Sequence, residues 1–297
     1  MRRDVKRITV LAHAKLNLGL QVVAKRDDGF HDIDTVFQTI SLADGIAIKE
    51  RRDATVTLRA TGLAVPEDET NLAFRAASLV IERTGCPGVA IELEKRTPVA
   101  AGLGGGSADA AAVLVGMETL YGLGLDPGRL RAMALELGSD VPFLIEGGTA
   151  RGRGRGEILD RLRPIVGVAF VLVVPPIAIR AGEAYASAGI RLTERDRFIR
   201  LSCSAIQEGD LPGCLAGLRN DLEEGQVRSH PEIGRIKQTL LDAGALAVVM
   251  SGSGPAVFAL VRGKEEAREV ASRVPECGWA VLVVQPVDVG AQVVEAT

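Results

Sequence analysis

A glycine-rich segment directly before an expected helix is the feature of this sequence best suited to binding an anion. The segment is Gly102-Leu103-Gly104-Gly105-Gly106-Ser107, and the helix is expected over residues 107–121. Glycines leave backbone N–H groups accessible, and a helix start adds unpaired N–H groups and a partial positive charge, so the pattern favours a phosphate chain. It matches neither a Walker A loop, which needs GK[ST], nor the glycine spacing of a Rossmann fingerprint. The alternative is a flexible loop in which Ser107 caps the helix.

Lys15 and Asn17 form a second candidate pair. They lie on a strand or bent hairpin expected over residues 8–22, where every even position is apolar and most odd positions are polar. Residues two apart on a strand point the same way, so both side chains are expected on its open face. A lysine there can bind phosphate or an oxygen that gains negative charge during a reaction. The alternative is an ordinary solvated face.

Asp140 and His31 are two further candidates for chemistry. Asp140, in Gly138-Ser139-Asp140-Val141-Pro142, is placed as a general base or an electrostatic partner of Lys15. Because a proline follows two residues later, a helix-start cap is an equal alternative. His31, in Asp28-Gly29-Phe30-His31, is either a polar contact to a substrate or a turn residue.

Two other segments carry unusual patterns. Ser251-Gly252-Ser253-Gly254 is a tight turn between two apolar strands, which either backs the glycine loop or simply connects a hairpin. Residues 151–156 read Arg-Gly-Arg-Gly-Arg-Gly and predict a loop. RNA binding is one interpretation of this basic run, but the chain has only ten aromatic residues (Phe 7, Tyr 2, Trp 1) and none is interleaved with it. A solvated loop near an anionic ligand is therefore favoured.

Composition limits the function classes. The chain has 297 residues, 47% hydrophobic and 25% charged, enough for two folded domains. Its net charge of −3 argues against a partner that is nucleic acid or an anionic membrane, and no stretch approaches the roughly 18 apolar residues of a membrane span. Four cysteines without CxxC spacing and three scattered histidines give no zinc signature. Reduced thiols in a cytoplasmic protein are expected.

The periodicity predicts a mixture of helices and strands. Strands are expected over residues 8–22, 36–50, 54–60, 88–94, 165–174, 245–251, 256–262 and 279–284. Helices are expected over residues 71–83, 107–121, 127–137, 181–188, 195–207, 211–219, 231–243 and 264–273. This order favours an α+β fold, with a domain boundary near residues 155–165 that divides the chain into 1–160 and 161–297.

Three motifs in this order resemble those of the GHMP kinase superfamily: residues 14–18, 98–108 and 251–259. The resemblance implies a two-domain α+β fold with the active site in the cleft between domains, and ATP and Mg²⁺ as cofactors. Four further segments, residues 28–31, 68–72, 137–143 and 220–223, are similar to one branch of that superfamily. That branch phosphorylates the 2-hydroxyl of a cytidine diphosphate-linked methylerythritol, a small-molecule substrate of the non-mevalonate route to isoprenoid precursors.

The resemblance assigns roles to individual residues. Asp140 becomes the catalytic carboxylate and Lys15 its partner in activating the hydroxyl, which agrees with a reaction that mainly requires positioning and charge stabilisation. Ser107 also becomes a candidate Mg²⁺ contact, although Ala108 stands where a second hydroxyl often follows and no carboxylate is assigned to the metal. The residues implied to contact ATP are Asn71, Lys95, Pro98, Ala101, Gly102, Leu103, Gly104, Gly105, Gly106 and Ser107.

The same resemblance assigns the substrate contacts. His31 would hydrogen-bond the cytosine edge, and Asn17 would support the sugar-alcohol end. Phe30 replaces the tyrosine of the branch pattern, which keeps ring stacking and loses the phenol hydrogen bond. Tyr185 is the candidate for the second ring, with a packed helix tyrosine as its alternative.

Two other functions stay open. A GHMP kinase for a homoserine-type or mevalonate-type alcohol would keep Lys15 and the glycine loop but would have no use for a cytosine site at Phe30 and His31. A non-catalytic nucleotide sensor would need the loops but not both Lys15 and Asp140.

Overall fold

Two long antiparallel strands, β1 (Arg7–Lys25) and β2 (His31–Glu50), form the centre of the structure. The computed structural model describes residues 6–187 and 198–297. In these residues the first sheet has seven strands in the order β11-β1-β2-β4-β3, with β5 pairing with both β2 and β6. The other strands of this sheet are β3 (Val56–Gly62), β4 (Val89–Lys95), β5 (Thr149–Gly154), β6 (Ile158–Arg161) and β11 (Ala291–Ala296).

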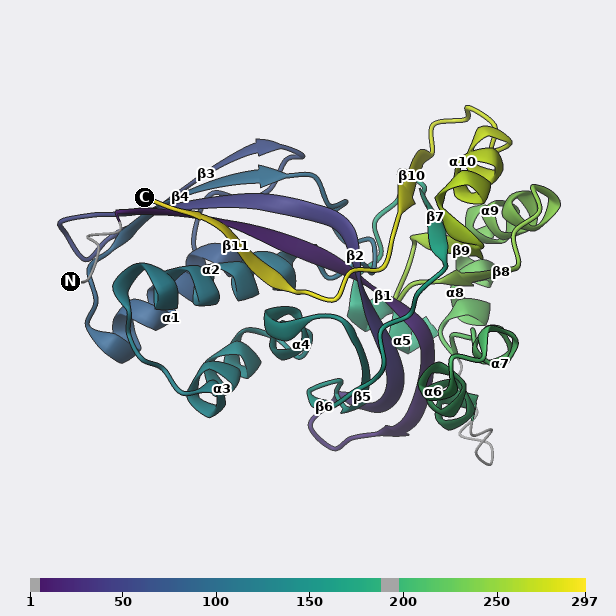
Figure 1. Ribbon diagram of the computed structural model, residues 1–297, viewed down its shortest axis with the longest axis horizontal. Helices are drawn as coiled ribbons and strands as arrows, with labels where there is room; N and C mark the ends of the chain where they lie inside the picture. Colours follow the sequence, from purple (N-terminus) through teal and green to yellow (C-terminus); the bar gives the residue numbers. More distant parts are fainter. Residues whose placement is uncertain (1–5, 188–197) are drawn as a thin grey trace.

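Four helices cover one face of this sheet (Figure 1). They are α1 (Leu72–Thr84), α2 (Gly105–Tyr121), α3 (Pro127–Leu137) and α4 (Val141–Glu146). Helix α2 is rich in alanine and buried along most of its length. At Gly116 a Cβ would lie 2.5 Å from Cδ1 of Ile48, so a small residue is needed for α2 to approach β2 this closely.

The second half of the chain builds a four-stranded sheet in the order β10-β7-β9-β8 among the described residues. Its strands are β7 (Ala169–Val174), β8 (Ala247–Met250), β9 (Val257–Val261) and β10 (Ala280–Val284), and its helices are α5 (Ala181–Ser187), α6 (Phe198–Glu208), α7 (Leu211–Ala216), α8 (Glu223–Ser229), α9 (Pro231–Asp242) and α10 (Gly263–Ser272). Apolar residues of α9 and α10 pack on one face of the sheet. The other face packs against α6 and against Leu16 and Leu18 of β1.

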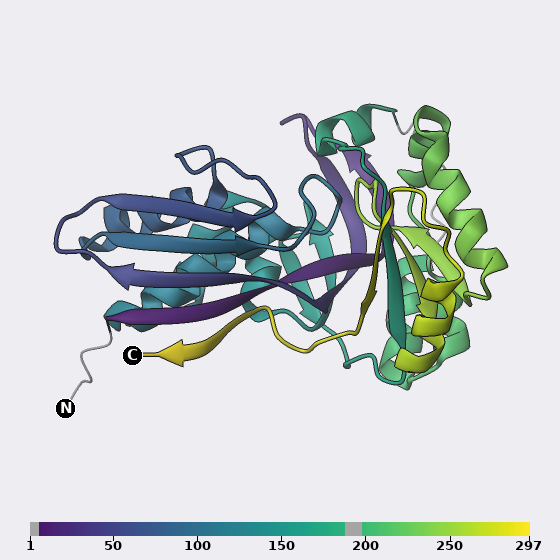
Figure 2. The ribbon, with the colours of Figure 1, turned by 90° about the horizontal axis from the view of Figure 1, so that it is seen from above.

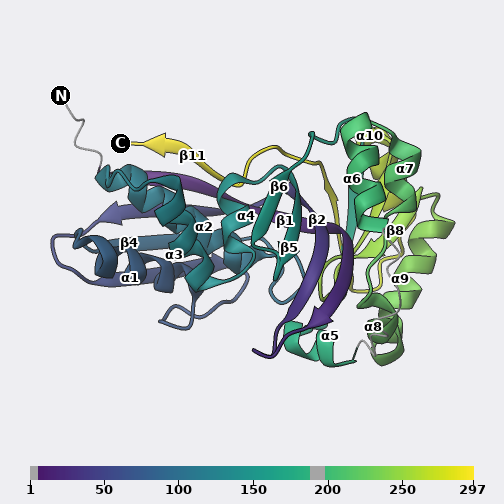
Figure 3. The same cartoon turned by 90° about the horizontal axis from the view of Figure 1, so that it is seen from below.

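Strands β1 and β2 join the two halves (Figures 2 and 3). Both continue beyond the helices of the first half to the side of the second half, and β11 returns from the second half to pair with β1. Residues 12–20 of β1 are buried at every position, because the strand passes between elements of both halves. The expectation that Lys15 and Asn17 lie on an open face was therefore wrong: their exposed fractions are 4% and 2%.

Most predicted elements are present, but the loop expected over residues 151–156 was wrong. Residues up to Gly154 belong to β5, which pairs with β2. Gly152 faces the ring of Phe37, where a Cβ would lie 2.5 Å from Cε2, so the glycine allows β5 to approach and does not break it. Sequence reasoning did not predict β6, β11, α4 or α8.

Some predicted boundaries are not decided by the structure. The expected start of a helix at residue 195 and the end of another at residue 188 lie outside the described residues. The division of the chain near residue 160 remains a prediction. Strand β11 comes late in the sequence but lies in the first sheet. In the described part of the chain, every helix is too short or too polar to span a lipid bilayer.

Candidate active site

Lys15 is the centre of a buried polar cluster on β1. Register shifts between His13 and Lys15 and between Asn17 and Gly19 interrupt the pairing of β1 with β2 on either side of it. The Lys15 Nζ atom donates a hydrogen bond to Asn17 Oδ1 at 2.6 Å and one to the carbonyl oxygen of Gly102 at 3.1 Å. It also lies 3.4 Å from Oδ2 of Asp140. The structure thus brings the predicted lysine and aspartate together at the glycine loop.

Both polar atoms of the Asn17 side-chain amide form hydrogen bonds. Its Oδ1 accepts the bond from Lys15, and its Nδ2 donates to Thr35 Oγ1 at 2.8 Å. Thr35, a residue that sequence reasoning missed, donates in turn to the carbonyl oxygen of Gly19 at 2.6 Å. This chain of hydrogen bonds fixes the direction of the Lys15 ammonium. The predicted contact of Asn17 with the sugar-alcohol end of a substrate stays a prediction.

Asp140 occupies the N-cap position of α4, but its side chain makes no capping hydrogen bond. Asp140 thus stands where a capping residue would stand, but its carboxylate does not cap the helix. The alternative in which the side chain serves as a helix cap is therefore wrong. The Asp140 side chain is 27% exposed, compared with 5% for Lys15. The carboxylate thus faces the lysine on one side and remains accessible on the other, as a group that meets a substrate must be.

The glycine loop, Gly102–Ser107, presents backbone to its surroundings. Gly104 is the N-cap of α2 with a φ of 69°, and the helix begins at Gly105 without a side-chain cap among the described residues. Ser107 is therefore inside the first turn, and the alternative in which it caps the helix is wrong. The loop is tied to β1 because the Lys15 backbone N–H donates to the carbonyl oxygen of Leu103 at 2.9 Å. Free N–H groups at the first turn, together with the helix dipole, suit an anion.

The turn at Ser251–Gly254 both connects a hairpin and backs the glycine loop. It joins β8 to β9, which are antiparallel neighbours. Ser251 Oγ donates to the carbonyl oxygen of Gly102 at 3.1 Å, and a Cβ at Gly102 would lie only 2.1 Å from the carbonyl oxygen of Ser251. Gly102, with a φ of 76°, permits this close approach of the second half to the loop.

Of the four predicted nucleotide contacts outside the loop, Pro98 and Ala101 lie in the segment that leads into it, and Ala101 is buried. The other two, Asn71 and Lys95, have partners within the protein. Asn71 caps α1: its Oδ1 accepts from the backbone N–H of Ala73 at 2.9 Å. Lys95 is buried and donates to Asp44 and Asp109, each at 2.6 Å. Burial, opposed by the positive charge of Lys95 and reinforced by the negative charge of Asp44, raises the pKa of Asp109 to about 7.

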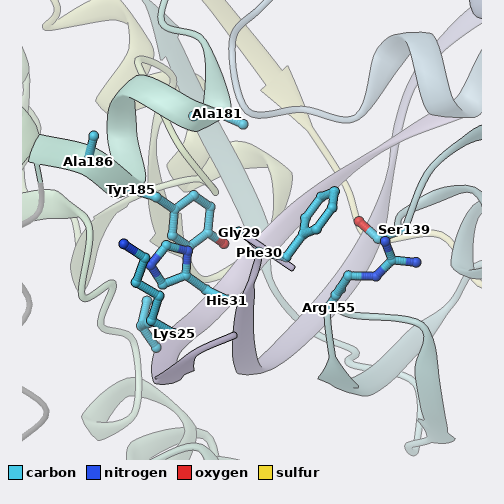
Figure 4. Close-up of a pocket in the computed structure, with 11 residues that line it drawn as sticks. Lys25, Gly29, Phe30, His31, Ser139, Arg155, Ala181, Tyr185 and Ala186 are labelled. Carbon is cyan, nitrogen blue, oxygen red and sulfur yellow. The ribbon is translucent and has the colours of Figure 1, made fainter. Parts of the chain in front are cut away.

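A cavity of about 740 Å³ lies beside the polar cluster and contains the predicted substrate residues Phe30, His31 and Tyr185 (Figure 4). Ser139, the neighbour of Asp140, also lines it, so the cavity extends to the segment that carries the candidate catalytic carboxylate. Burial raises the pKa of the Tyr185 phenol, and the charge of Asp140 adds to that rise. The first and second halves of the chain thus meet at this cavity, with Tyr185 contributed by α5.

The rings in the cavity are paired differently from the predicted sandwich of Phe30 and Tyr185. Tyr185 stacks on His31, with ring centroids 4.8 Å apart and planes inclined by 16°. Phe30 is 54% exposed, and the guanidinium carbon of Arg155 lies 4.9 Å from its ring centroid. In Figure 4 the Phe30 ring stands between the Tyr185–His31 pair and Arg155. The aromatic residues are gathered in one place, and a flat ligand would have to separate or flank these pairs.

The basic run at residues 151–156, which begins on β5, does not form a free cationic stripe. Arg151 forms two hydrogen bonds with Asp34, at 2.8 and 2.6 Å, and Arg153 pairs with Asp160 at 3.0 Å. Only the third arginine of the run, Arg155, lines the cavity. Two of the three arginines that suggested RNA binding are therefore paired with carboxylates of this chain.

The fold and this site define a class. Residues 71–148 match the GHMP kinases N-terminal domain, and residues 204–278 match the GHMP kinases C-terminal domain. A homoserine kinase structure from Cytophaga hutchinsonii, 20% identical, superposes with a TM-score of 0.82 over 99% of this chain and 98% of that one, which supports the fold alone. The structure is that of a GHMP kinase, a small-molecule kinase.

More similar relatives narrow the class. The 4-diphosphocytidyl-2-C-methyl-D-erythritol kinase of Moorella thermoacetica is 46% identical over 91% of this chain and 95% of its own length. The enzyme of the same name from Pelotomaculum thermopropionicum is 43% identical over 93% of this chain and 96% of its own length. A crystal structure of 4-(cytidine 5'-diphospho)-2C-methyl-D-erythritol kinase is 35% identical, with a TM-score of 0.77 over 93% of this chain and 98% of that one. The chain belongs to the 4-diphosphocytidyl-2-C-methyl-D-erythritol kinase family.

Proposed function

We propose that this chain transfers the γ-phosphoryl group of ATP to the 2-hydroxyl of 4-(cytidine 5'-diphospho)-2-C-methyl-D-erythritol, a step of the non-mevalonate route to isoprenoid precursors. The observation that carries the proposal is the contact of Lys15 with both Asp140 and the glycine loop, next to a cavity that is lined by Phe30, His31 and Tyr185 and reaches Ser139, the neighbour of Asp140. Family membership supports the same reaction.

In the proposed reaction the substrate hydroxyl oxygen forms a bond to the γ-phosphorus, and the bond from that phosphorus to the β–γ bridging oxygen breaks to release ADP. Asp140 accepts the hydroxyl proton. Lys15 stabilises the negative charge that develops on the attacking oxygen, and Asn17 holds its ammonium in place. The backbone N–H groups at the start of α2 bind the phosphates. These roles suit phosphoryl transfer, which depends on positioning and charge stabilisation.

The residues present also fit Mg²⁺. The described residues contain no group of three His, Cys, Asp or Glu side chains arranged to hold a metal. Mg²⁺ bound with ATP does not need one, because phosphate oxygens and water supply most of its ligands. Ser107 has a hydroxyl near Gly138, in the segment that leads to Asp140: its Oγ lies 3.9 Å from where a Gly138 Cβ would be. We assign Ser107 to the metal, which would neutralise charge on the phosphates.

The cavity supplies the proposed specificity. Phe30 and Tyr185 offer rings on which cytosine can stack, and His31 offers a ring nitrogen to its polar edge. The four cysteines are unpaired in the structure, which fits a reducing compartment, so we place the reaction in the cytoplasm.

The experiment is to measure ADP release from Mg-ATP with the cytidine diphosphate-linked methylerythritol and with methylerythritol phosphate lacking the cytidine. Turnover of the first alone supports the whole proposal. Equal turnover of both would retain the kinase and remove the cytosine site. Preference for homoserine or mevalonate as acceptor would overturn the substrate, and nucleotide binding without turnover of any acceptor would favour the sensor alternative.

A further inference from the structure

Three ionisable side chains from separate segments meet in the interior beneath the first turn of α2. Asp44 comes from β2, Lys95 ends β4, and Asp109 lies in α2. The Lys95 Nζ atom lies 2.6 Å from Oδ2 of each aspartate. All three residues are at least 97% buried. The mechanism proposed above uses neither aspartate.

The group is attached to the segment that leads into the glycine loop. Asp44 Oδ1 accepts hydrogen bonds from the backbone N–H groups of Arg96 and Thr97, at 2.6 and 2.7 Å. These residues immediately precede Pro98. Asp44 thus fixes the direction in which the chain leaves β4.

The group also contacts the loop itself. A Cβ at Gly105 would lie 3.0 Å from Lys95 Nζ and 2.8 Å from the methyl carbon of Thr97, so the first residue of α2 rests directly on this cluster. Asp109 follows one helical turn later, and Lys95 joins it to Asp44. The carboxylates and the lysine therefore connect β2, the end of β4 and the start of α2.

Burying three ionisable side chains is a costly way to stabilise a protein, because apolar packing of the same volume often serves as well. The group is also incompletely satisfied: within the described residues, Asp109 Oδ1 has no hydrogen-bond partner. A role limited to stability therefore does not account for the group. Its position instead connects it with the shape of the loop, where small displacements of N–H groups change the binding of an anion.

We propose that Asp44 and Asp109, acting through Lys95, are positioning residues that hold the glycine loop in its phosphate-binding form. The proposal rests on the proposed function, in which the loop binds the phosphates of ATP. Asp44 and Asp109 do not touch the nucleotide in this arrangement. Their effect is on nucleotide affinity and not on the cavity at Phe30, His31 and Tyr185.

The test compares Asp44→Asn, Asp109→Leu and Asp109→Asn with the wild-type chain. Asp44→Asn places an amide N–H against the Lys95 ammonium, and Asp109→Leu removes the acceptor, so each is expected to weaken ATP and ADP binding about 10- to 100-fold. Asp109→Asn retains an acceptor for Lys95 and is expected to restore most of the affinity. The KM for the second substrate is expected to change less than about threefold. Calorimetry supplies the nucleotide Kd, and steady-state kinetics supply both KM values.

Glu136→Gln is the matched control, since it removes an exposed carboxylate that pairs with Arg83 on the surface of the same half. Variants that melt at a lower temperature but keep wild-type nucleotide Kd would overturn the proposal, and so would parallel increases in both KM values. If Asp44→Asn does not fold, the proposal is tested by comparing the nucleotide Kd of Asp109→Leu with that of Asp109→Asn. Failure of the wild-type chain to bind ADP or ATP would instead contradict the proposed function of the loop.

Discussion

Lys15 and Asp140 lie 125 residues apart in the sequence and form an ion pair in which Nζ is 3.4 Å from Oδ2. The same ammonium donates to Asn17 and to the carbonyl oxygen of Gly102, so one lysine connects the candidate base, β1 and the glycine loop. The pair is asymmetric: the lysine is buried and the carboxylate is partly exposed. This asymmetry assigns the proton-accepting role to Asp140, because its carboxylate can accept a proton and is the more accessible of the two groups.

Asp140→Asn is therefore expected to reduce kcat by about 10²- to 10⁴-fold, the usual contribution of a general base. Nucleotide affinity should stay within about threefold of wild type, since the phosphates bind to the loop. Single-turnover kinetics and the Kd of ATP measure the two effects. Asp160→Asn, which removes a surface partner of Arg153, is the control. Unchanged turnover of Asp140→Asn would remove Asp140 from the mechanism.

Asn17→Ala tests whether the asparagine supports Lys15 or contacts the substrate. The substitution removes the acceptor 2.6 Å from Lys15 Nζ and the donor to Thr35. We expect kcat to fall about 10- to 100-fold with little change in either KM, because a hydrogen bond to a charged group is lost at the reacting centre. A large rise in KM for the sugar-alcohol substrate with kcat preserved would show instead that Asn17 is mainly a substrate contact.

The alternation of apolar residues predicted β1 correctly, but it did not predict that the polar face of β1 is buried. Periodicity describes one strand and its own core, whereas the polar face of β1 is covered by the glycine loop and by the turn at Ser251–Gly254, where a Cβ at Gly252 would lie 3.3 Å from Lys15 Nζ. Polar residues on a face usually indicate solvent. Here Lys15 and Asn17 are buried because they hydrogen-bond each other and the glycine loop, which a single sequence pattern does not reveal.

Pairing between distant segments also explains the elements that were missed. The run at residues 151–156 contains three glycines and predicted a loop, but Gly152 allows β5 to lie against Phe37. Helix α4 has only six residues, and β11 is defined by its pairing with β1. By contrast, the glycine loop and the start of α2 were predicted within two residues, because their signals are local. Asp44 and Asp109 carried no local signal at all.

His31→Ala is expected to raise the KM for the cytidine-containing substrate about tenfold, since one hydrogen bond to the base is lost. The KM for ATP should not change, because the glycine loop lies outside the cavity lining. Val23→Ala, at an exposed position on the same pair of strands, is the control. An unchanged KM would make His31 a stacking partner of Tyr185 and not a substrate contact.

Gly102→Ala is expected to disturb the contact between the two halves. The position has a φ of 76°, and a Cβ would lie 2.1 Å from the carbonyl oxygen of Ser251. Gly85→Ala is the matched control, since its φ is 70° but a Cβ there would meet no atom within 4 Å. We expect Gly85→Ala to lower the free energy of unfolding by about 1–2 kcal/mol through backbone strain alone, and Gly102→Ala to lower it more and to weaken ATP binding. Urea denaturation measures the free energy of unfolding of both variants. If the two variants lose the same amount and Gly102→Ala binds ATP as the wild type does, the close contact of Gly102 with Ser251 would be contradicted.

Thiol reactivity is expected to differ strongly among the cysteines. Cys277 is exposed, whereas burial raises the pKa of Cys203 and of Cys214 to about 11. Only the thiolate is alkylated, and a thiol of that pKa is about 0.1% ionised at pH 8. Iodoacetamide at pH 8 should therefore label Cys277 first. The labelling rate of the partly exposed Cys203 should rise about tenfold per pH unit up to pH 10, because its thiolate fraction rises in that proportion. Peptide mass spectrometry measures each rate, with Cys277→Ser as the control, and rapid labelling of Cys203 at pH 8 would show that its thiol is not shielded by the packing of α6.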